Sequence, residues 1–478
     1  MSRIRRRTLL IYLIIMIISV LLTTSGCAGA SSQQRQNMYK ELDETVARND
    51  FQASLQQLIL AQAANRPLYN NNNVISLYID KGLLEHYGGL YRDSSTSLQD
   101  AERLIQEAYT RSLTQSVATY IINDNTREYP GEDFEDIYIS VFNALNHYKL
   151  NDIDGALVEV RKLTLPSGKL ELLSRKYDQG NQKIRGEHGA AIDQVQNSDG
   201  ASEIVTKPTS FSNSALARYL SVLFYQADRN YDSARIELEQ LRLAFAQQPG
   251  IYNFAVPNAI QNIENTPLGE ARLDILTFVG LSPIKEEEIL TQFFPIFQDR
   301  MLRNPQFSLP KLVDRPNRID RIEVVVNGER HNLELLENMG AVITDTFNAR
   351  YTNIFLKTYI RTLLKYTAAD VASREVQKRS GGGLGGALVN ATASAALRAG
   401  VDASENADIR MARFLPNKAY IGSINLEPGT YNVTMNFYSG RNLVRSKTRE
   451  DVVVRANNLN LAQFVNLDFI YAIGEVES

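Results

Sequence analysis

The chain has 478 residues, with 51 lysines and arginines against 54 aspartates and glutamates, four histidines and a single cysteine. This slightly acidic balance, without a basic patch, excludes a protein that binds nucleic acid mainly through phosphate contacts. One cysteine excludes intrachain disulfides and cysteine-based zinc or iron–sulfur centres. A chain of this length must therefore be held by core packing, and we expect two or three domains.

The first 26 residues predict an export signal. Arginines at positions 3, 5, 6 and 7 precede an apolar run from Leu9 to Leu22, which is short for a membrane span. The run ends in Thr23-Thr-Ser-Gly26-Cys27, where small residues before a cysteine are similar to the processing site of bacterial lipoproteins. We expect cleavage between Gly26 and Cys27 and a covalent lipid on Cys27. An uncleaved anchor and an ordinary signal peptide cut elsewhere are the alternatives.

Residues 27–292 are predicted to be helical, because apolar residues recur three and four positions apart. One pattern occurs three times, with a small residue at the second position. Its members are Tyr91, Ser94, Leu98 and Ala101; Ile153, Ala156, Val160 and Leu163; and Tyr231, Ala234, Leu238 and Leu241. These offsets are typical of tetratricopeptide hairpins, in which the small residue lets two helices cross closely. The spacing is irregular, so we expect a degenerate solenoid, with a generic helical bundle as the alternative.

The pattern changes after residue 292. Four prolines, at 295, 305, 310 and 316, predict a linker over 293–316. Residues 317–478 predict an α+β domain, in which a strand at 321–326 enters an Asn327-Gly turn and a helix covers about 346–378. A Gly/Ala-rich helix is expected at 381–401, and alternating residues from 409 to 467 predict an antiparallel β-sandwich. The expected fold class is therefore α+β, a helical solenoid followed by a smaller β-sandwich-like domain.

Groups for catalysis are scarce in this sequence. The four histidines are isolated from one another, and the chain has neither a nucleophile elbow nor a P-loop. The acidic run 132–136 is interpreted as the start of a helix, where carboxylates complement the helix dipole. We therefore expect no enzyme activity, no catalytic residues, no metal and no cofactor apart from the lipid at Cys27.

Several short motifs occur in a distinctive order. They are Gly280-Leu-Ser-Pro283-Ile-Lys285, a helix with Arg361 and Lys365, Ala407-Asp408-Ile-Arg410, Leu415-Pro416 and Leu426-Glu-Pro-Gly429-Thr-Tyr431. In this order they resemble a poorly characterised family of bacterial tetratricopeptide-containing outer-membrane lipoproteins. The resemblance implies a role in cell-envelope assembly beside small companion lipoproteins, with no activity of its own.

We therefore expect a non-enzymatic lipoprotein that is anchored in the outer membrane, faces the periplasm and acts as a helical-repeat scaffold for other envelope proteins. Extended repeat surfaces suit such binding. Ala28 directly after the lipidated cysteine favours the outer membrane in a Gram-negative envelope. The alternatives are a regulator of peptidoglycan synthesis that contacts a synthase, and an envelope hydrolase with an unrecognised site.

Overall fold

The computed structural model describes most of the chain. The described residues are 37–64, 67–113, 127–165, 168–173, 210–264, 267, 269–291, 306–380, 392–393 and 406–469. The fold is α+β, as predicted, with a helical half followed by three sheets and one long helix. The expected signal at 1–26, its cleavage site at Gly26 and Cys27, and most of the expected Gly/Ala-rich helix lie outside the described residues.

Eight helices in the described ranges pair into four hairpins. They are residues 37–47 with α2 (Phe51–Ala63), α3 (Val74–Tyr87) with α4 (Tyr91–Leu113), α5 (Asp133–Lys149) with α6 (Ile153–Thr164), and α8 (Ala215–Ala227) with α9 (Tyr231–Gln247). Two short helices, η1 (Asn71–Asn73) and α10 (Asn258–Gln261), lie between and after them. Successive hairpins pack on one another, since α4 contacts α5 and α6 contacts α8.

All four hairpins turn in the same way. The first helix ends with a residue of positive φ, which is Asn49 (61°), Gly89 (82°), Asn151 (59°) or Arg229 (59°). The second helix begins two residues later, and in three hairpins the Asp or Asn in between caps it with its side chain. A left-handed residue ends a helix, and an acidic or amide cap satisfies the first N–H groups of the next one. The sequence therefore encodes one turn geometry four times.

Two four-stranded sheets follow the helices. The first has the order β10 (Asn460–Asn466), β1 (Ala271–Leu281), β7 (Pro416–Leu426) and β6 (Glu334–Asn338), with β1 and β10 parallel. The second has the order β5 (Glu329–Asn332), β4 (Arg321–Val326), β8 (Gly429–Ser439) and β9 (Asn442–Val454), all antiparallel. The predicted Asn327-Gly turn is confirmed, because it joins β4 to β5 with φ of 51° and 82°.

Strand β1 is buried on both faces. Leu273 and Ile275 belong to a core that the two sheets share, whereas Leu276 and Phe278 belong to the core of the helices. Alternate residues of a strand point to opposite faces, so β1 lies between the helices and the second sheet. The molecule is therefore layered as helices, first sheet and second sheet.

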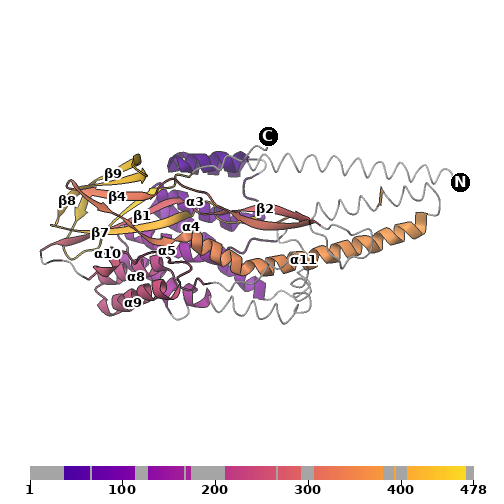
Figure 1. Cartoon of the computed structure of the whole chain (residues 1–478), viewed down its shortest axis with the longest axis horizontal. Helices are drawn as coiled ribbons and strands as arrows, with labels where there is room; N and C mark the ends of the chain where they lie inside the picture. The colour runs from indigo at the N-terminus through magenta and orange to yellow at the C-terminus, as the bar shows by residue number, and fades with distance from the viewer. Residues whose placement is uncertain are drawn as a thin grey trace.

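A helix and a two-stranded ribbon leave this layered body on the same side (Figure 1). The helix is α11 (Met339–Ser380), which covers the helix predicted at 346–378, and the ribbon pairs β2 (Ile284–Thr291) with β3 (Gln306–Val313). At 1.5 Å per residue, α11 is about 63 Å long. It contacts β3 and β7. We call α11 and this ribbon the arm.

The predicted domain boundaries are wrong in two places. Strands β1 and β2 lie inside the range 27–292 that was expected to be helical, and β3 lies inside the expected linker at 293–316. The long apolar run of β1 has no clear period because both of its faces are buried, so it could be mistaken for a helix. Pro310 is tolerated in β3 because this strand has a single partner. Since β1 joins β7 and β10 in one sheet, 293–316 does not separate two cores.

Candidate functional site

The predicted crossing residues lie where the helices of each hairpin meet. The Ser94 hydroxyl donates a 2.7 Å hydrogen bond to the Gly82 carbonyl, and a Cβ on Gly82 would lie 2.7 Å from the Leu98 side chain. The other buried members are Ala101, Ala156, Val160, Leu163, Ala234, Leu238 and Leu241. Close helix contact at these positions thus depends on small side chains.

The three residues at the first position of the pattern are less buried than the other members. Tyr91 is half-buried, with its ring 5.6 Å from that of His86, and Ile153 is also half-buried. Tyr231 is 66% exposed, so its expected packing role is wrong. As the first residue of α9 it lies outside the crossing, which Ala234 makes three residues later.

Sequence reasoning missed the first of the four hairpins. Phe51, Ser54, Leu58 and Ala61 of α2 follow the same offsets, and the first three are buried. The signal was present in the sequence, together with Asn49 and Asp50 at the turn.

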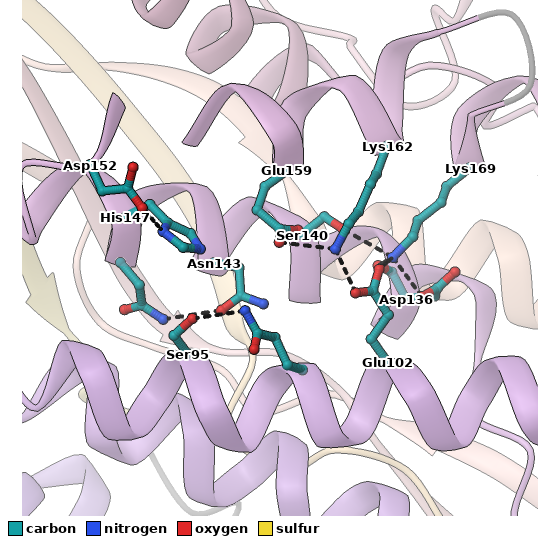
Figure 2. A network of polar contacts seen from close by, with 12 residues as sticks. Ser95, Glu102, Asp136, Ser140, Asn143, His147, Asp152, Glu159, Lys162 and Lys169 are labelled. Atoms are coloured by element: carbon teal, nitrogen blue, oxygen red, sulfur yellow. Dashed lines mark hydrogen bonds and ion pairs between the residues drawn. The ribbon is translucent and has the colours of Figure 1, made fainter. Parts of the chain in front are cut away.

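Ion pairs join the second hairpin to the third (Figure 2). The Lys162 ammonium lies 2.7 Å from Glu102 and 2.9 Å from Glu159, and Lys169 lies 2.7 Å from both Glu102 and Asp136. The Lys169 ammonium also donates to the Ser140 hydroxyl at 2.9 Å. Because each cation bridges two carboxylates, this network fixes how α4, α5 and α6 sit on one another.

A segment without regular secondary structure packs into the core of the helical half. Residues 406–415, which we call the strap, run without regular secondary structure into β7. Met411, Ala412 and Phe414 are buried there and belong to the core of the helices. The strap includes the Ala407-to-Leu415 motifs that carry the family resemblance. Those motifs therefore have a packing role in this fold.

Two buried carboxylates hold the backbone of the strap. Asp80 accepts the N–H groups of Arg413 at 2.7 Å and Phe414 at 3.0 Å, and Glu135 accepts that of Ala412 at 2.5 Å. A buried segment outside a sheet needs acceptors for its N–H groups. The helices supply these acceptors as acidic side chains.

Tyrosine hydroxyls complete both carboxylate sites. Tyr69 donates to Asp80 at 2.6 Å, and Tyr129 donates to Glu135 at 2.9 Å. Burial raises the pKa of Asp80 to about 6 against these hydrogen bonds, and burial with the nearby Glu132 charge raises the pKa of Glu135 to about 7. The strap is thus held by two acids whose pKa values are raised by burial.

The arginines of the strap reach the surrounding helices. The Arg413 guanidinium lies 2.6 Å from Asp43, and the Arg410 guanidinium donates to the carbonyls of Asn72 at 2.9 Å and Arg127 at 2.6 Å. A buried guanidinium is stable when its donors are paired in this way. These contacts join the strap to residues from 43 to 127.

A charge cluster anchors the arm to the helices. Glu132, at the N-terminus of α5, pairs with Lys285 of β2 and with Arg350 of α11. Glu132 and Glu135 also form a capping box for α5, which confirms that the acidic run starts a helix. These ion pairs of Glu132, Lys285 and Arg350 therefore hold the base of the arm against α5.

Two of the three histidines that the structure describes, His86 and His147, have hydrogen-bond partners within the fold. His86 is buried between Asn146 at 2.6 Å and Gln463 at 2.7 Å, and burial lowers its pKa to about 4. His147 lies 2.8 Å from Asp152, the cap of α6. Within the described ranges, no three His, Cys, Asp or Glu side chains are grouped to hold a metal ion. The buried polar groups of this site therefore join elements of the chain to one another.

Comparison with protein-family models, with curated proteins and with solved structures finds no match for this chain. In the part of the chain that the structure describes, no helix has the length and hydrophobicity needed to cross a membrane.

Proposed function

We propose that this protein is a non-enzymatic scaffold of the cell envelope, anchored in the outer membrane by a lipid on Cys27. Its arm binds another envelope protein. The helical half is interpreted as a degenerate tetratricopeptide-like array and the two four-stranded sheets as a β-sandwich. The four identical hairpin turns and the core shared by the sheets support this interpretation.

The arm is the observation that carries the proposal. The first turns of α11 pack in the core, where Met339, Val342 and Ile343 are fully buried. The helix then runs on beyond the layered body for much of its length (Figure 1). One end of α11 is thus held against the helices by the Glu132 ion pairs, and the other end extends away from the body. This arrangement suits a protein that binds a partner at a distance.

The side of the helices that the strap covers is not open to a partner. Phe414 and Leu415 of the strap are buried and lead directly into β7, which is a central strand of the first sheet. Removing the strap would break this sheet and leave Asp80 and Glu135 buried without their N–H donors, which is costly. The proposal therefore differs from our expectation that the repeats present a concave face to the partner.

Photo-crosslinking in whole cells tests the proposal. A photo-reactive amino acid would replace Ile289 of β2, which is 60% exposed, or the exposed Lys378 of α11. We expect discrete adducts with one or a few envelope proteins at both positions, identified by mass spectrometry.

Matched positions on the helical surface provide the control. Tyr231 is 66% exposed and Val158 is 51% exposed, and neither belongs to the arm. The same adducts at Tyr231 and Val158, or none at Ile289 and Lys378, would contradict the arm as the partner surface. Adducts with a peptidoglycan synthase would favour the regulatory alternative.

A further inference from the structure

Four cationic side chains gather where β9 meets the helices and the edge of the first sheet. Arg445, Lys447 and Arg449 alternate along β9, and Lys149 comes from the C-terminal end of α5. The three β9 residues pair with Phe437, Met435 and Val433 of β8, whose side chains lie in the core between the sheets. Because cross-strand partners share a face, these side chains lie on the core-facing side of β9 at the rim, where Arg445 and Lys447 are half-buried and Arg449 is exposed. We call the four residues the rim cluster.

Two of these side chains cover the outer edge of β10. The Lys447 ammonium donates to the Val465 carbonyl at 2.5 Å, and that of Lys149 donates to the Leu461 carbonyl at 3.3 Å. Inward-pointing charges on an edge strand are a known way to prevent pairing with another chain. One lysine would be enough for that purpose, so edge protection does not explain four cations.

No carboxylate of the described residues is among the charged groups that act on the two lysines of the rim cluster. The charged groups that act on the two lysines are arginines: Arg449 on Lys149, and Arg445 with Arg449 on Lys447. Burial and these charges lower the pKa of Lys149 to about 7 and that of Lys447 to about 8. These positive charges oppose one another, so an anion bound among them would favour the charged lysines.

Two hydrogen-bond donors beside these cations also lack acceptors in the described structure. The Nε of Arg445 and the Nδ2 of Asn466 are buried without a partner, although Arg445 Nη1 donates to the Arg48 carbonyl at 3.0 Å. Asn466 is fully buried and accepts from Asn49, which also lies 3.5 Å from the Lys447 ammonium. A buried donor without an acceptor costs free energy. An oxyanion bound beside the half-buried Arg445 side chain would supply the acceptor that its Nε lacks.

We propose that the rim cluster binds a phosphate-type anion, either a free phosphate or the phosphodiester headgroup of an anionic lipid. Phosphate oxygens accept several N–H groups at once, and mixed arginine and lysine sites suit them. Positions 445 to 449 span about 13 Å of strand, so the cluster has room for more than one phosphate group. This site goes beyond the proposed scaffold role and does not depend on it.

Ligand-dependent thermal unfolding of the full chain in a neutral detergent tests the site. Inorganic phosphate and glycerophosphoglycerol, the soluble headgroup of phosphatidylglycerol, would each be titrated against sodium chloride at equal ionic strength. We expect a saturable rise of the thermal midpoint beyond that in chloride. Tighter binding of glycerophosphoglycerol identifies a lipid headgroup as the source, and binding of inorganic phosphate alone identifies a free phosphate.

A charge-matched pair of variants makes the test specific. Arg445→Gln with Arg449→Gln should weaken the apparent affinity at least tenfold, whereas Arg235→Gln with Arg330→Gln, which removes two arginines paired with carboxylates, should leave it unchanged. Arg449→Gln alone keeps the Arg445 hydrogen bond, so it tests the site if the double variant does not fold. The proposal is overturned if neither ligand exceeds chloride, or if both double variants lose binding equally.

Calorimetric titration with glycerophosphoglycerol gives a second readout. A bound anion favours the charged lysines, so binding at pH 8 should take up protons from the buffer. The uptake appears as a dependence of the heat on the buffer's ionisation enthalpy.

Discussion

The Ser94 hydroxyl bonds to the Gly82 carbonyl across the closest approach of α3 and α4. The bond needs a residue without Cβ on one helix and a small polar residue on the other. The third and fourth hairpins cross in the same register, with buried alanines at positions 156 and 234 in place of Ser94.

A larger side chain at these crossings should destabilise the protein. Ala156→Leu or Ala234→Leu adds atoms to a filled contact and should cost ~1–3 kcal/mol in the free energy of unfolding. Chemical denaturation measures this cost. Val158→Leu, two residues from Ala156 but 51% exposed, is the control and should change stability little. Equal stability of all three variants would contradict the close crossing.

Cutting the chain between the helical half and the sheets should prevent folding of either piece. Residues 28–292 carry β1, whereas its partners β7 and β10 lie in the remaining residues. Each piece would also expose half of a shared core. We expect that neither piece alone shows a cooperative thermal transition by circular dichroism, and that coexpressed pieces copurify. A cooperative transition in the isolated helical piece would contradict the shared core.

Stability should fall as the pH rises through neutrality because of Glu135. Its pKa is 4.5 ordinarily and about 7 in the fold. The folded state therefore favours the protonated acid, so this contribution is complete below pH 4.5 and is lost as the pH rises through 7. At 1.36 kcal/mol per unit, it amounts to about 3 kcal/mol at most. Asp80 acts in the same direction, whereas His86, with a lowered pKa, stabilises above pH 6.5 and loses that contribution as the pH falls through 4.

Urea denaturation from pH 4.5 to 8 isolates the Glu135 contribution. The stability of the wild-type protein relative to Glu135→Gln should decrease over this range, because glutamine does not titrate. Glu239→Gln, on the exposed side of α9, is the charge-matched control and should show a nearly constant difference. A constant difference for Glu135→Gln as well would show that Glu135 keeps its ordinary pKa in the fold.

Removing the expected lipid attachment should release the protein from membranes. Cys27→Ala eliminates the only thiol in the chain. We expect loss of radiolabelled palmitate and recovery in the soluble fraction after a carbonate wash, since several acyl chains are needed for a stable anchor. Ser25→Ala keeps a small residue before the cysteine and should remain in the membrane. A Cys27→Ala protein that stays with membranes would point to an uncleaved signal.

Short-range features of this fold could be predicted from the sequence. Ser94, Ala156 and Ala234 are buried as their spacing indicated, and the Asn327-Gly turn is where its dipeptide predicts a hairpin. The pattern also predicted most of helix α11, within two residues of its C-terminal end and seven residues short of its N-terminal end. Each of these depends on contacts within one hairpin or one helix, so the information lies in neighbouring residues.

Long-range features were decided only by the tertiary structure. β1 pairs in parallel with β10, so that Leu273 faces Asn460 far along the chain, and no local pattern encodes that choice. Asp80 and Glu135 look like ordinary helix residues until the strap brings its N–H groups to them. The rim cluster likewise forms only when β9 brings its cations to Lys149. The sequence by itself determined the hairpins and the single cysteine. Tertiary packing decided which buried charges meet, because burial and pairing depend on residues far apart in the chain.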